Sequence, residues 1–254
     1  MAIVPCGTGN LLARNLGLPM DPVTALERAL EGTSAGIDVG RVAGDGLPES
    51  RFTVMAGAGF DAAMVRDASE RLKARLGWAA YVISAVRHLR DPRMRLSIRL
   101  DGGPVLERWA RMVVVGNVGA LQGGLPLLPD ARPDSGRLDV VLLDPRGAGG
   151  WLATAGHFGA RMLPGRSPRA AFPAGGQRQA GGALEYFTAE RIDLRFSQPQ
   201  PRELDGDSVG DGVGLTIEVE PGALRALLPM RTRPAECTPA AEEEENSSAT
   251  ARGR

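Results

Sequence analysis

The chain has 254 residues, of which 43% are hydrophobic and 24% charged, as in an ordinary globular protein long enough for a buried core. Thirty basic and thirty acidic residues give a net charge of zero, which excludes a broad basic field for nucleic acid or an anionic membrane. Cys6 and Cys237 exclude a disulfide framework, and the two histidines add no recognised zinc spacing. Neither a membrane-spanning run nor a secretory signal is recognised, so a cytoplasmic location is expected.

The first 34 residues are predicted to form a strand, a glycine loop and two short helices. Residues 2–5 are expected to be a buried strand with an unpaired edge, and residues 10–16 a helix. Asp21 is expected to cap a second helix that ends before Gly32. Its predicted apolar face consists of Val23, Leu26 and Leu30.

From residue 37 onward, period-two alternation and short apolar runs predict mostly strands. They are expected at residues 37–42, 52–55, 96–100, 109–115, 137–143, 184–188, 190–196, 200–204, 214–220 and 223–229. The turn Asp101-Gly102-Gly103 predicts a hairpin, and the acidic end of the chain reads as a disordered tail. A glycine loop, two helices and a long surface loop are expected at residues 56–59, 77–90, 149–163 and 164–182.

Three segments carry residues suited to chemistry, and the first spans Pro5–Arg14. A strand, a glycine loop and a helix start offer backbone N–H groups and a positive helix end to a phosphate. The segment matches neither a Walker A loop nor the dinucleotide fingerprint. Taken alone, it is more simply explained as a strand-to-helix turn.

The other two segments are rich in carboxylates. Between Asp130 and Asp139, Asp134 stands in a tight turn and could supply one of the one or two carboxylates that Mg²⁺ prefers. Further on, Asp205 and Asp207 flank a glycine, and close acids can divide the roles of base and metal partner. Each segment taken alone is more simply explained as a turn.

Together, in their order and spacing, these segments resemble the diacylglycerol kinase-like lipid kinases over roughly residues 2–230. Gly7–Pro19 resembles the family's segment just after its nucleotide loop. Pro129–Val140 is similar to its metal-loop segment, and Leu204–Asp207 to its catalytic DGE-type motif. Two further segments resemble their family counterparts, at Gly57–Ala62 and Lys73–Tyr81.

The sequence departs from the family pattern in two places. Asp207 stands where the family usually has glutamate, which shortens the reach of the carboxylate by about one C–C bond and calls for a small shift or a water. The family's GGDGT-type phosphate loop, which resembles that of NAD kinases, has no counterpart in the sequence. The resemblance therefore implies the back end of a nucleotide domain followed by a whole second domain.

The implied fold is α/β plus mostly-β. A remnant of an NAD-kinase-like α/β domain is expected over residues 1–34, a β-sandwich or β-rich domain over 35–230, and the acidic tail over 231–254. The implied partners are a lipid substrate and a peripherally contacted membrane, with no nucleic acid. Oligomeric state is left open, with a homodimer as one option.

The implied activity is ATP- and Mg²⁺-dependent phosphorylation of a hydroxyl on a diacylglycerol-like or sphingoid lipid. By resemblance, Asp207 is the candidate base, Asp205 supports it or the metal, and Asp134 belongs to the magnesium loop. The residues assigned to the nucleotide side are Gly7, Thr8, Gly9 and Asn10. The alternatives are a catalytically incompetent lipid- or partner-binding module and, more weakly, an NAD kinase.

Overall fold

The computed structural model describes residues 1–7, 9–59, 93–121, 124–146, 150, 154, 178–180 and 183–229. Two short helices lie in this part of the chain, α1 (Leu11–Asn15) and α2 (Pro22–Leu30). The strands are β1 (Thr33–Gly44), β2 (Leu47–Phe52), β3 (Met55–Gly59), β4 (Met94–Leu100), β5 (Val105–Ala110), β6 (Met112–Gly116), β7 (Leu138–Leu143), β8 (Arg178–Ala180), β9 (Leu184–Ala189), β10 (Arg191–Leu204) and β11 (Asp207–Leu228). The prediction of a β-rich fold with few helices is confirmed.

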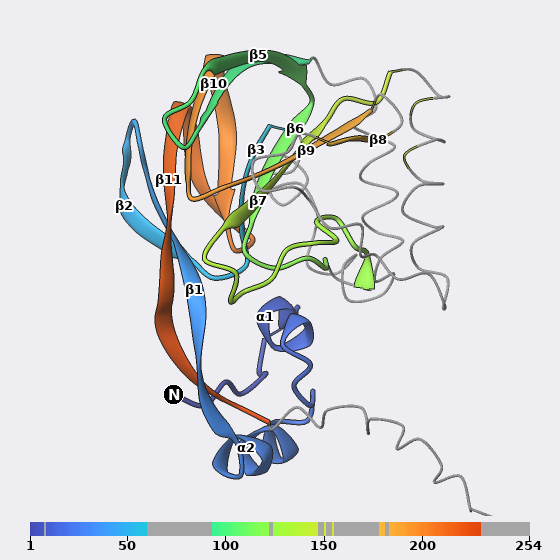
Figure 1. Cartoon of the computed structure of the whole chain (residues 1–254), viewed down its shortest axis with the longest axis vertical. Coiled ribbons are helices and arrows are strands. Elements are labelled where there is room, and N and C mark those ends of the chain that lie inside the picture. The colour runs from blue at the N-terminus through green and yellow to red at the C-terminus, as the bar shows by residue number, and fades with distance from the viewer. Residues whose placement is uncertain are drawn as a thin grey trace, which may run out of the picture.

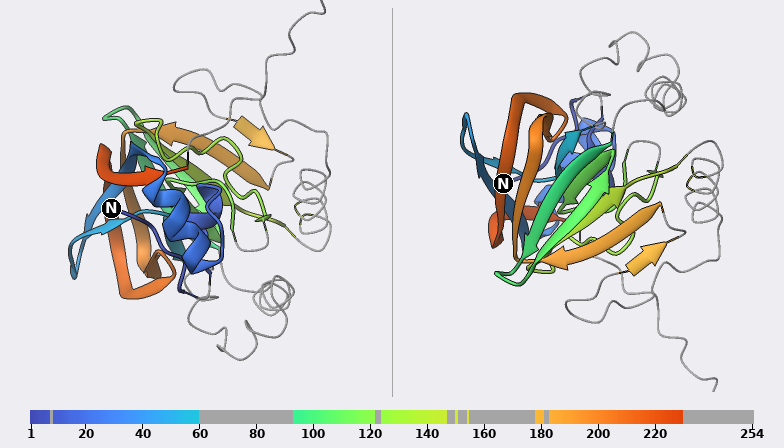
Figure 2. Two further views of the ribbon diagram at one scale, coloured as in Figure 1. Left: turned by 90° about the horizontal axis from the view of Figure 1, so that it is seen from below. Right: turned by 90° about the horizontal axis from the view of Figure 1, so that it is seen from above.

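The strands form one continuous antiparallel sheet, in the order β2-β1-β11-β10-β3-β6-β7-β9-β8. The sheet curves back on itself because β10 bends (Figures 1 and 2). The first half of β10 pairs with β4, which carries β5, whereas its last three residues pair with β3. The ladder between β10 and β11 is irregular between these two halves, after Arg195.

Two hydrophobic cores result from this curvature. The main core lies inside the curved sheet and takes side chains from both of its arms, for example Phe52, Ile98, Leu138, Ile192 and Ile217. The second core lies on the other face of β3, β6 and β7, and side chains from residues 118–121, 125–131 and α1 pack in it. Side chains of β7 alternate between the two cores, as the pleat of a strand requires.

The N-terminal segment differs from the prediction of a strand over residues 2–5. Ala2 makes a single parallel bridge to Leu227, whose N–H is donated to the carbonyl of Met1. The bridge does not extend into a ladder, and the other edge of this part of β11 pairs with β1. The predicted unpaired strand edge over residues 2–5 is therefore absent (Figure 1).

Helix α2 begins where the sequence places it, but it faces the other way. Asp21 accepts a hydrogen bond from the N–H of Thr24 at 2.8 Å and caps the helix as predicted. The small side chains Ala25 and Ala29 form the buried face instead. The predicted apolar face is exposed and consists of Val23, Leu26 and Leu30.

Several strand boundaries also differ. The predicted strand over 52–55 is interrupted, and the predicted glycine loop over 56–59 belongs to the buried strand β3. The predicted strand over 109–115 is split into β5 and β6 at Arg111, whose N–H donates to the carbonyl of Leu143 on β7. Residues 178–180, expected in a surface loop, form β8. The last four predicted strands join in pairs into β10 and β11.

Some predictions lie outside the described residues. They concern Thr8, the helix over 77–90, nearly all of the helix over 149–163, and the tail over 231–254. Among the helices that are described, none has both the length and the hydropathy needed to cross a membrane.

Candidate functional site

The predicted catalytic motif lies in the tight turn between β10 and β11. Leu204 pairs with Asp207, and the two residues between them have positive φ angles, 49° at Asp205 and 93° at Gly206. This is the conformation of a two-residue hairpin turn, in which glycine and aspartate are the favoured residues. The Asp-Gly pair therefore forms the hairpin that the sequence predicts.

Asp205 anchors this hairpin to the connection between β2 and β3. Its carboxylate accepts the backbone N–H groups of Thr53, Val54 and Met55 at 2.8–3.0 Å, and the Thr53 hydroxyl at 3.0 Å. Its own N–H is donated to the Met55 carbonyl. A carboxylate has about four acceptor positions, so these contacts use them all. They also explain the break between β2 and β3.

Asp207 differs from Asp205 in its surroundings. The residue is exposed, and its side chain makes no hydrogen bond or ion pair with any described residue. A carboxylate that is held on a rigid turn yet remains unbonded is available to accept a proton. The geometry thus separates the two acids into an anchor, Asp205, and an exposed carboxylate without a bond to any described residue, Asp207.

Arg202 fixes the same hairpin from its other side. Its buried guanidinium donates to the carbonyls of Gly210, Asp211 and Gly214, and to the carbonyl and carboxylate of Asp45, at 2.9–3.4 Å. A Cβ atom on Gly212 would lie 2.3 Å from the guanidinium carbon, so the glycine makes room for it. The base of the hairpin is therefore tightly packed around one charge.

Asn117, directly after β6, connects the hairpin to the neighbouring segments. Its Nδ2 donates to the carbonyls of Asp38 at 2.7 Å and Thr53 at 3.1 Å. Its backbone N–H donates to the carbonyl of Val54. The side chain is fully buried, and its Oδ1 has no hydrogen-bond partner. Through Thr53, Asn117 is one step away from the Asp205 anchor.

Asp38 continues this network to the predicted magnesium loop. Its N–H is donated to Pro133 at 2.6 Å, and its buried carboxylate accepts the N–H groups of Gly136 at 2.6 Å and Gly222 at 2.8 Å. A continuous series of hydrogen bonds thus runs from Asp205 through Asn117 and Asp38 to residues 133–136. Two of the three motifs found in the sequence are connected through it.

Asp134 itself is exposed and lies 3.5 Å from Arg132 in an ion pair. The next residue, Ser135, bonds through Oγ to the carbonyls of Arg132 and Arg137, both at 3.0 Å. Within the described ranges, no group of three or more His, Cys, Asp or Glu residues could hold a metal ion. These residues alone do not fit a magnesium site, so no step below runs through Mg²⁺.

Two further acids, Asp130 and Asp139, lie in the same segment. Asp139 belongs to β7, on the side of that strand that faces the second core. The pKa of Asp139 is raised to about 7, mainly by burial and secondly by the charge of Asp130, while Arg137 acts in the opposite direction. Asp139 therefore holds its proton up to near-neutral pH.

The glycine loop before α1 is closed by its own asparagine. Gly7 donates its N–H to Oδ1 of Asn10 at 2.8 Å, and Nδ2 of Asn10 donates to the Gly7 carbonyl at 2.7 Å. Asn10 has a φ of 48°, Gly9 accepts a bond from Arg14 at 3.1 Å, and Thr8 is not described. The Gly7 N–H is thus not available to a phosphate in this conformation.

Asn15 joins this first motif to the rest of the site. Its side-chain amide exchanges two 2.8 Å hydrogen bonds with the backbone of Ala120, three residues after Asn117. All three sequence motifs are therefore linked through residues 117–120. Sequence reasoning missed the four polar residues that connect the motifs, which are Asn15, Asp38, Asn117 and Arg202. The signal that the sequence offered for them was a polar side chain beside a buried apolar run.

Comparisons with known proteins show the family and the fold of the chain. Two family models match the chain, one described as the diacylglycerol kinase catalytic domain over residues 1–42, the other as the YegS C-terminal NAD kinase beta sandwich-like domain over residues 54–154. A Bacillus anthracis structure titled as a diacylglycerol kinase superimposes with a TM-score of 0.62 at 23% identity, covering 89% of this chain and 67% of that one. This likeness shows the shared fold.

Sequence relatives are closer. A YegS-like lipid kinase of Pseudomonas aeruginosa is 33% identical over 234 residues, which are 90% of this chain and 68% of the relative. A Mycobacterium tuberculosis protein named diacylglycerol kinase is 32% identical over 144 residues, covering 56% of this chain and 46% of that protein. The chain belongs to the diacylglycerol kinase-like family of lipid kinases.

Proposed function

We propose that the chain carries the acceptor side of an ATP-dependent lipid kinase and that Asp207 is its general base. In this reaction the lipid hydroxyl gives its proton to Asp207 while its oxygen bonds to the γ-phosphorus of ATP. The bond between that phosphorus and the β–γ bridging oxygen breaks, ADP leaves, and Asp207 later releases the proton to water.

The observation that carries this proposal is the contrast between the two acids of the hairpin. Asp205 is saturated by four hydrogen bonds, whereas the exposed Asp207 is bonded to no described residue. Phosphoryl transfer depends mainly on positioning, and Asp205 and Arg202 hold the turn rigidly from two sides. Rigid support of a free carboxylate is the arrangement that a base requires.

The substrate class is proposed from the names of the relatives, one a lipid kinase and one a diacylglycerol kinase. We assign the acceptor to a lipid with a primary hydroxyl, of the diacylglycerol or sphingoid type. Residues 7–10 are assigned to the nucleotide side because they precede α1, which Asn15 links to the site.

The test is transfer of labelled γ-phosphate from ATP, with Mg²⁺ present, to diacylglycerol or sphingosine in mixed micelles. The Asp207→Asn variant is expected to lose about 10²- to 10⁴-fold in kcat, the range for general-base catalysis. Asp211→Asn, an exposed acid four residues further along β11, is the matched control and is expected to retain activity.

Three outcomes would overturn the proposal. Full turnover by the Asp207→Asn variant would remove this residue from the mechanism. Phosphorylation of NAD in place of both lipids would reassign the acceptor. Absence of lipid turnover in the unsubstituted chain, with vesicle binding retained, would make the chain a binding module.

A further inference from the structure

The β4–β5 hairpin presents one side to the core and the other to water. Its register places Arg95 opposite Trp109 and Arg99 opposite Val105, and directly opposed residues share one face of a sheet. The other face carries Leu96 and other buried core residues. The outward face exposes 53% of Trp109 and 46% of Val105, although no described element packs over them.

We propose that this outward face is the surface through which the protein docks on bilayers containing anionic phospholipids, with Trp109 as the interfacial anchor. The proposal goes beyond the kinase activity and rests on the proposed function only for its purpose, access to a membrane-borne substrate. Its physical basis is the composition and geometry of the hairpin.

The first argument is the arrangement of charge. Residues 93–111 contain five arginines and two carboxylates, in a chain whose net charge is zero. Of the two acids, Asp101 accepts the N–H groups of Glu190 and Arg191, and Glu107 lies 3.4 Å from Arg95. Arginine therefore outnumbers acid in this segment, but Glu107 neutralises Arg95, so the charge offered to an anionic surface is that of the arginines left unpaired.

Two arginines of this face are left without a counter-ion among the described residues. Arg99 on β4 and Arg195 on β10, which lies opposite Ser97, make no hydrogen bond or ion pair there. The acid nearest to Arg99 in the register, Asp193, is bonded to Arg191 instead. Both guanidinium groups are thus free to meet lipid phosphates.

The second argument is the tryptophan and the way it is held. The Arg93 guanidinium lies 5.5 Å from the centre of the Trp109 ring, a cation–π distance, and is itself fixed by two hydrogen bonds to Asp144. Tryptophan prefers membrane interfaces, where its ring enters the apolar region and its N–H stays among the headgroups.

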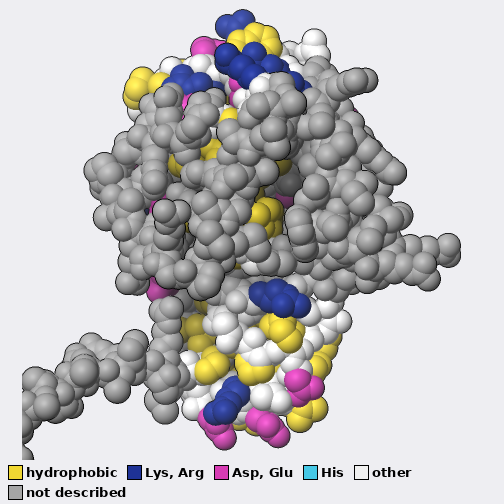
Figure 3. Space-filling view, turned by 90° about the vertical axis from the view of Figure 1, so that its right-hand side faces the viewer, with side chains coloured by type: hydrophobic (Ala, Val, Ile, Leu, Met, Phe, Trp, Pro, Cys, Tyr) yellow, Lys and Arg dark blue, Asp and Glu magenta, His cyan; other side chains and the backbone are white. Residues whose placement is uncertain are grey.

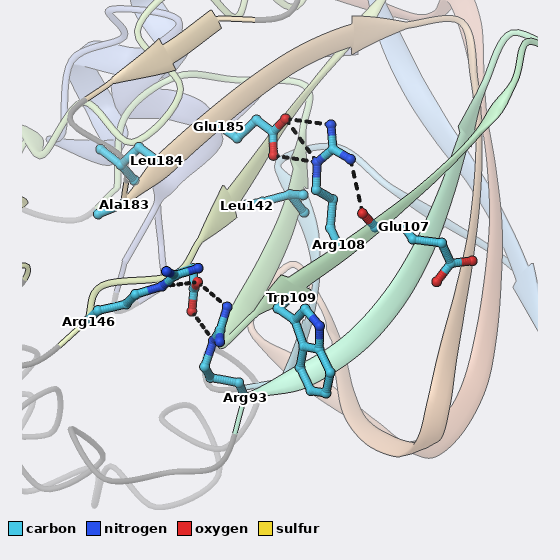
Figure 4. A pocket seen from close by; sticks show the side chains of 10 residues that line it. Arg93, Glu107, Arg108, Trp109, Leu142, Arg146, Ala183, Leu184 and Glu185 are labelled. Atoms are coloured by element: carbon cyan, nitrogen blue, oxygen red, sulfur yellow. Dashed lines mark hydrogen bonds and ion pairs between the residues drawn. The ribbon is translucent and has the colours of Figure 1, made fainter.

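The neighbouring groove, about 380 Å³ in volume, helps to locate the contact (Figure 4). Its arginines are already neutralised, since Arg108 forms several hydrogen bonds to Glu185 and Arg146 lies 3.4 Å from Asp144. The unpaired charges lie instead on the outward face. Basic and hydrophobic side chains gather at the upper end of the molecule, where β5 lies, whereas α2 lies at the lower end (Figures 1 and 3).

The experiment is co-sedimentation of the chain with vesicles of phosphatidylcholine, with and without phosphatidylglycerol, in the absence of ATP. We expect binding that requires phosphatidylglycerol, a loss of about fivefold for Arg99→Gln and of at least about tenfold for Trp109→Ala. The matched controls are Arg28→Gln and Leu30→Ala, an exposed arginine and an exposed leucine on α2, which are expected to bind as the unsubstituted chain does.

Fluorescence provides a second readout. With Trp78 and Trp151 replaced by phenylalanine, Trp109 is the only tryptophan of the chain, and its emission is expected to shift to the blue on anionic vesicles. Equal binding by the Trp109→Ala and Leu30→Ala variants, or an unshifted emission, would overturn the proposal. Because vesicle binding is measured without turnover, an inactive chain that still docks would refute only the kinase proposal.

Discussion

The partly buried acid Asp139 makes the stability of the fold depend on pH in an unusual direction. Its pKa rises from the ordinary value of 3.8 to about 7, mainly because of burial and secondly because of Asp130. Between these two pH values the folded state keeps a proton that the unfolded chain has lost. The free energy of unfolding therefore falls as pH rises through this window and levels off above about pH 7.

The magnitude follows from the same pKa values. A difference from 3.8 to about 7, at about 1.4 kcal/mol for each pH unit, corresponds to a loss on the order of 4 kcal/mol. Asp139→Asn keeps the shape and removes the titration. The variant is therefore expected to match the unsubstituted chain at about pH 4 and to exceed it in stability by up to this amount at about pH 8.

The assay is urea unfolding of both proteins across this pH range. Subtracting one stability curve from the other removes the contributions of groups that titrate in both proteins. A second variant, Asp130→Asn, removes the neighbouring charge and is expected to reduce the pH dependence without abolishing it, because burial is the larger cause. A stability difference between Asp139→Asn and the unsubstituted chain that does not change with pH would refute the reasoning.

The remaining stability predictions concern the supports of the site. Asn117→Ala leaves the buried carbonyl of Asp38 and the partly buried carbonyl of Thr53 without their donor and should cost about 2–5 kcal/mol by urea unfolding. A loss below about 1 kcal/mol in the same assay would contradict its connecting role. Arg202→Met strands five oxygen acceptors and should lower the unfolding free energy by about 3–5 kcal/mol, so an unchanged melting temperature would contradict the account. Gly40→Ala places a Cβ 2.2 Å from the Phe52 ring and should lower the free energy of unfolding by about 1–3 kcal/mol. In the double variant, Phe52→Leu should partly restore this loss. Strictly additive losses of stability in the double variant would argue against this clash.

The parts of the fold that could be predicted are those determined by local chemistry. Aspartate followed by glycine selects a tight turn, and the hairpin at Asp205 and Gly206 forms as expected. The capping aspartate before α2 and the apolar run of β7 were also sufficient by themselves. In each case the residues that determine the structure lie within a few positions of one another.

The errors arose where a distant residue determines the outcome. The chain breaks between β2 and β3 because the carboxylate of Asp205, some 150 positions away, takes the N–H groups of a local run that otherwise reads as a strand. Likewise, α2 contacts β11, far away in the sequence, and the side of the helix that is buried carries Ala25, whereas Leu26 remains exposed. No local pattern contains this information.

The candidate site shows the same division. Asp207 could be recognised from its motif, but its freedom and the engagement of Asp205 are consequences of tertiary hydrogen bonds. Asp38 and Asn117 resemble ordinary residues at strand positions, and only the folded chain shows that they connect the motifs. The supporting residues of a site are therefore harder to predict than the group they support.

The central claim, that Asp207 is the base of a lipid kinase, is tested most directly by comparing its two closest replacements. The measurement is kcat for phosphate transfer from ATP to a diacylglycerol or sphingoid lipid by the unsubstituted chain, Asp207→Glu and Asp207→Asn. Glutamate retains a proton acceptor and should keep most of the turnover, whereas asparagine should reduce it about 10²-fold or more. Equal turnover by the glutamate and asparagine variants would contradict the claim.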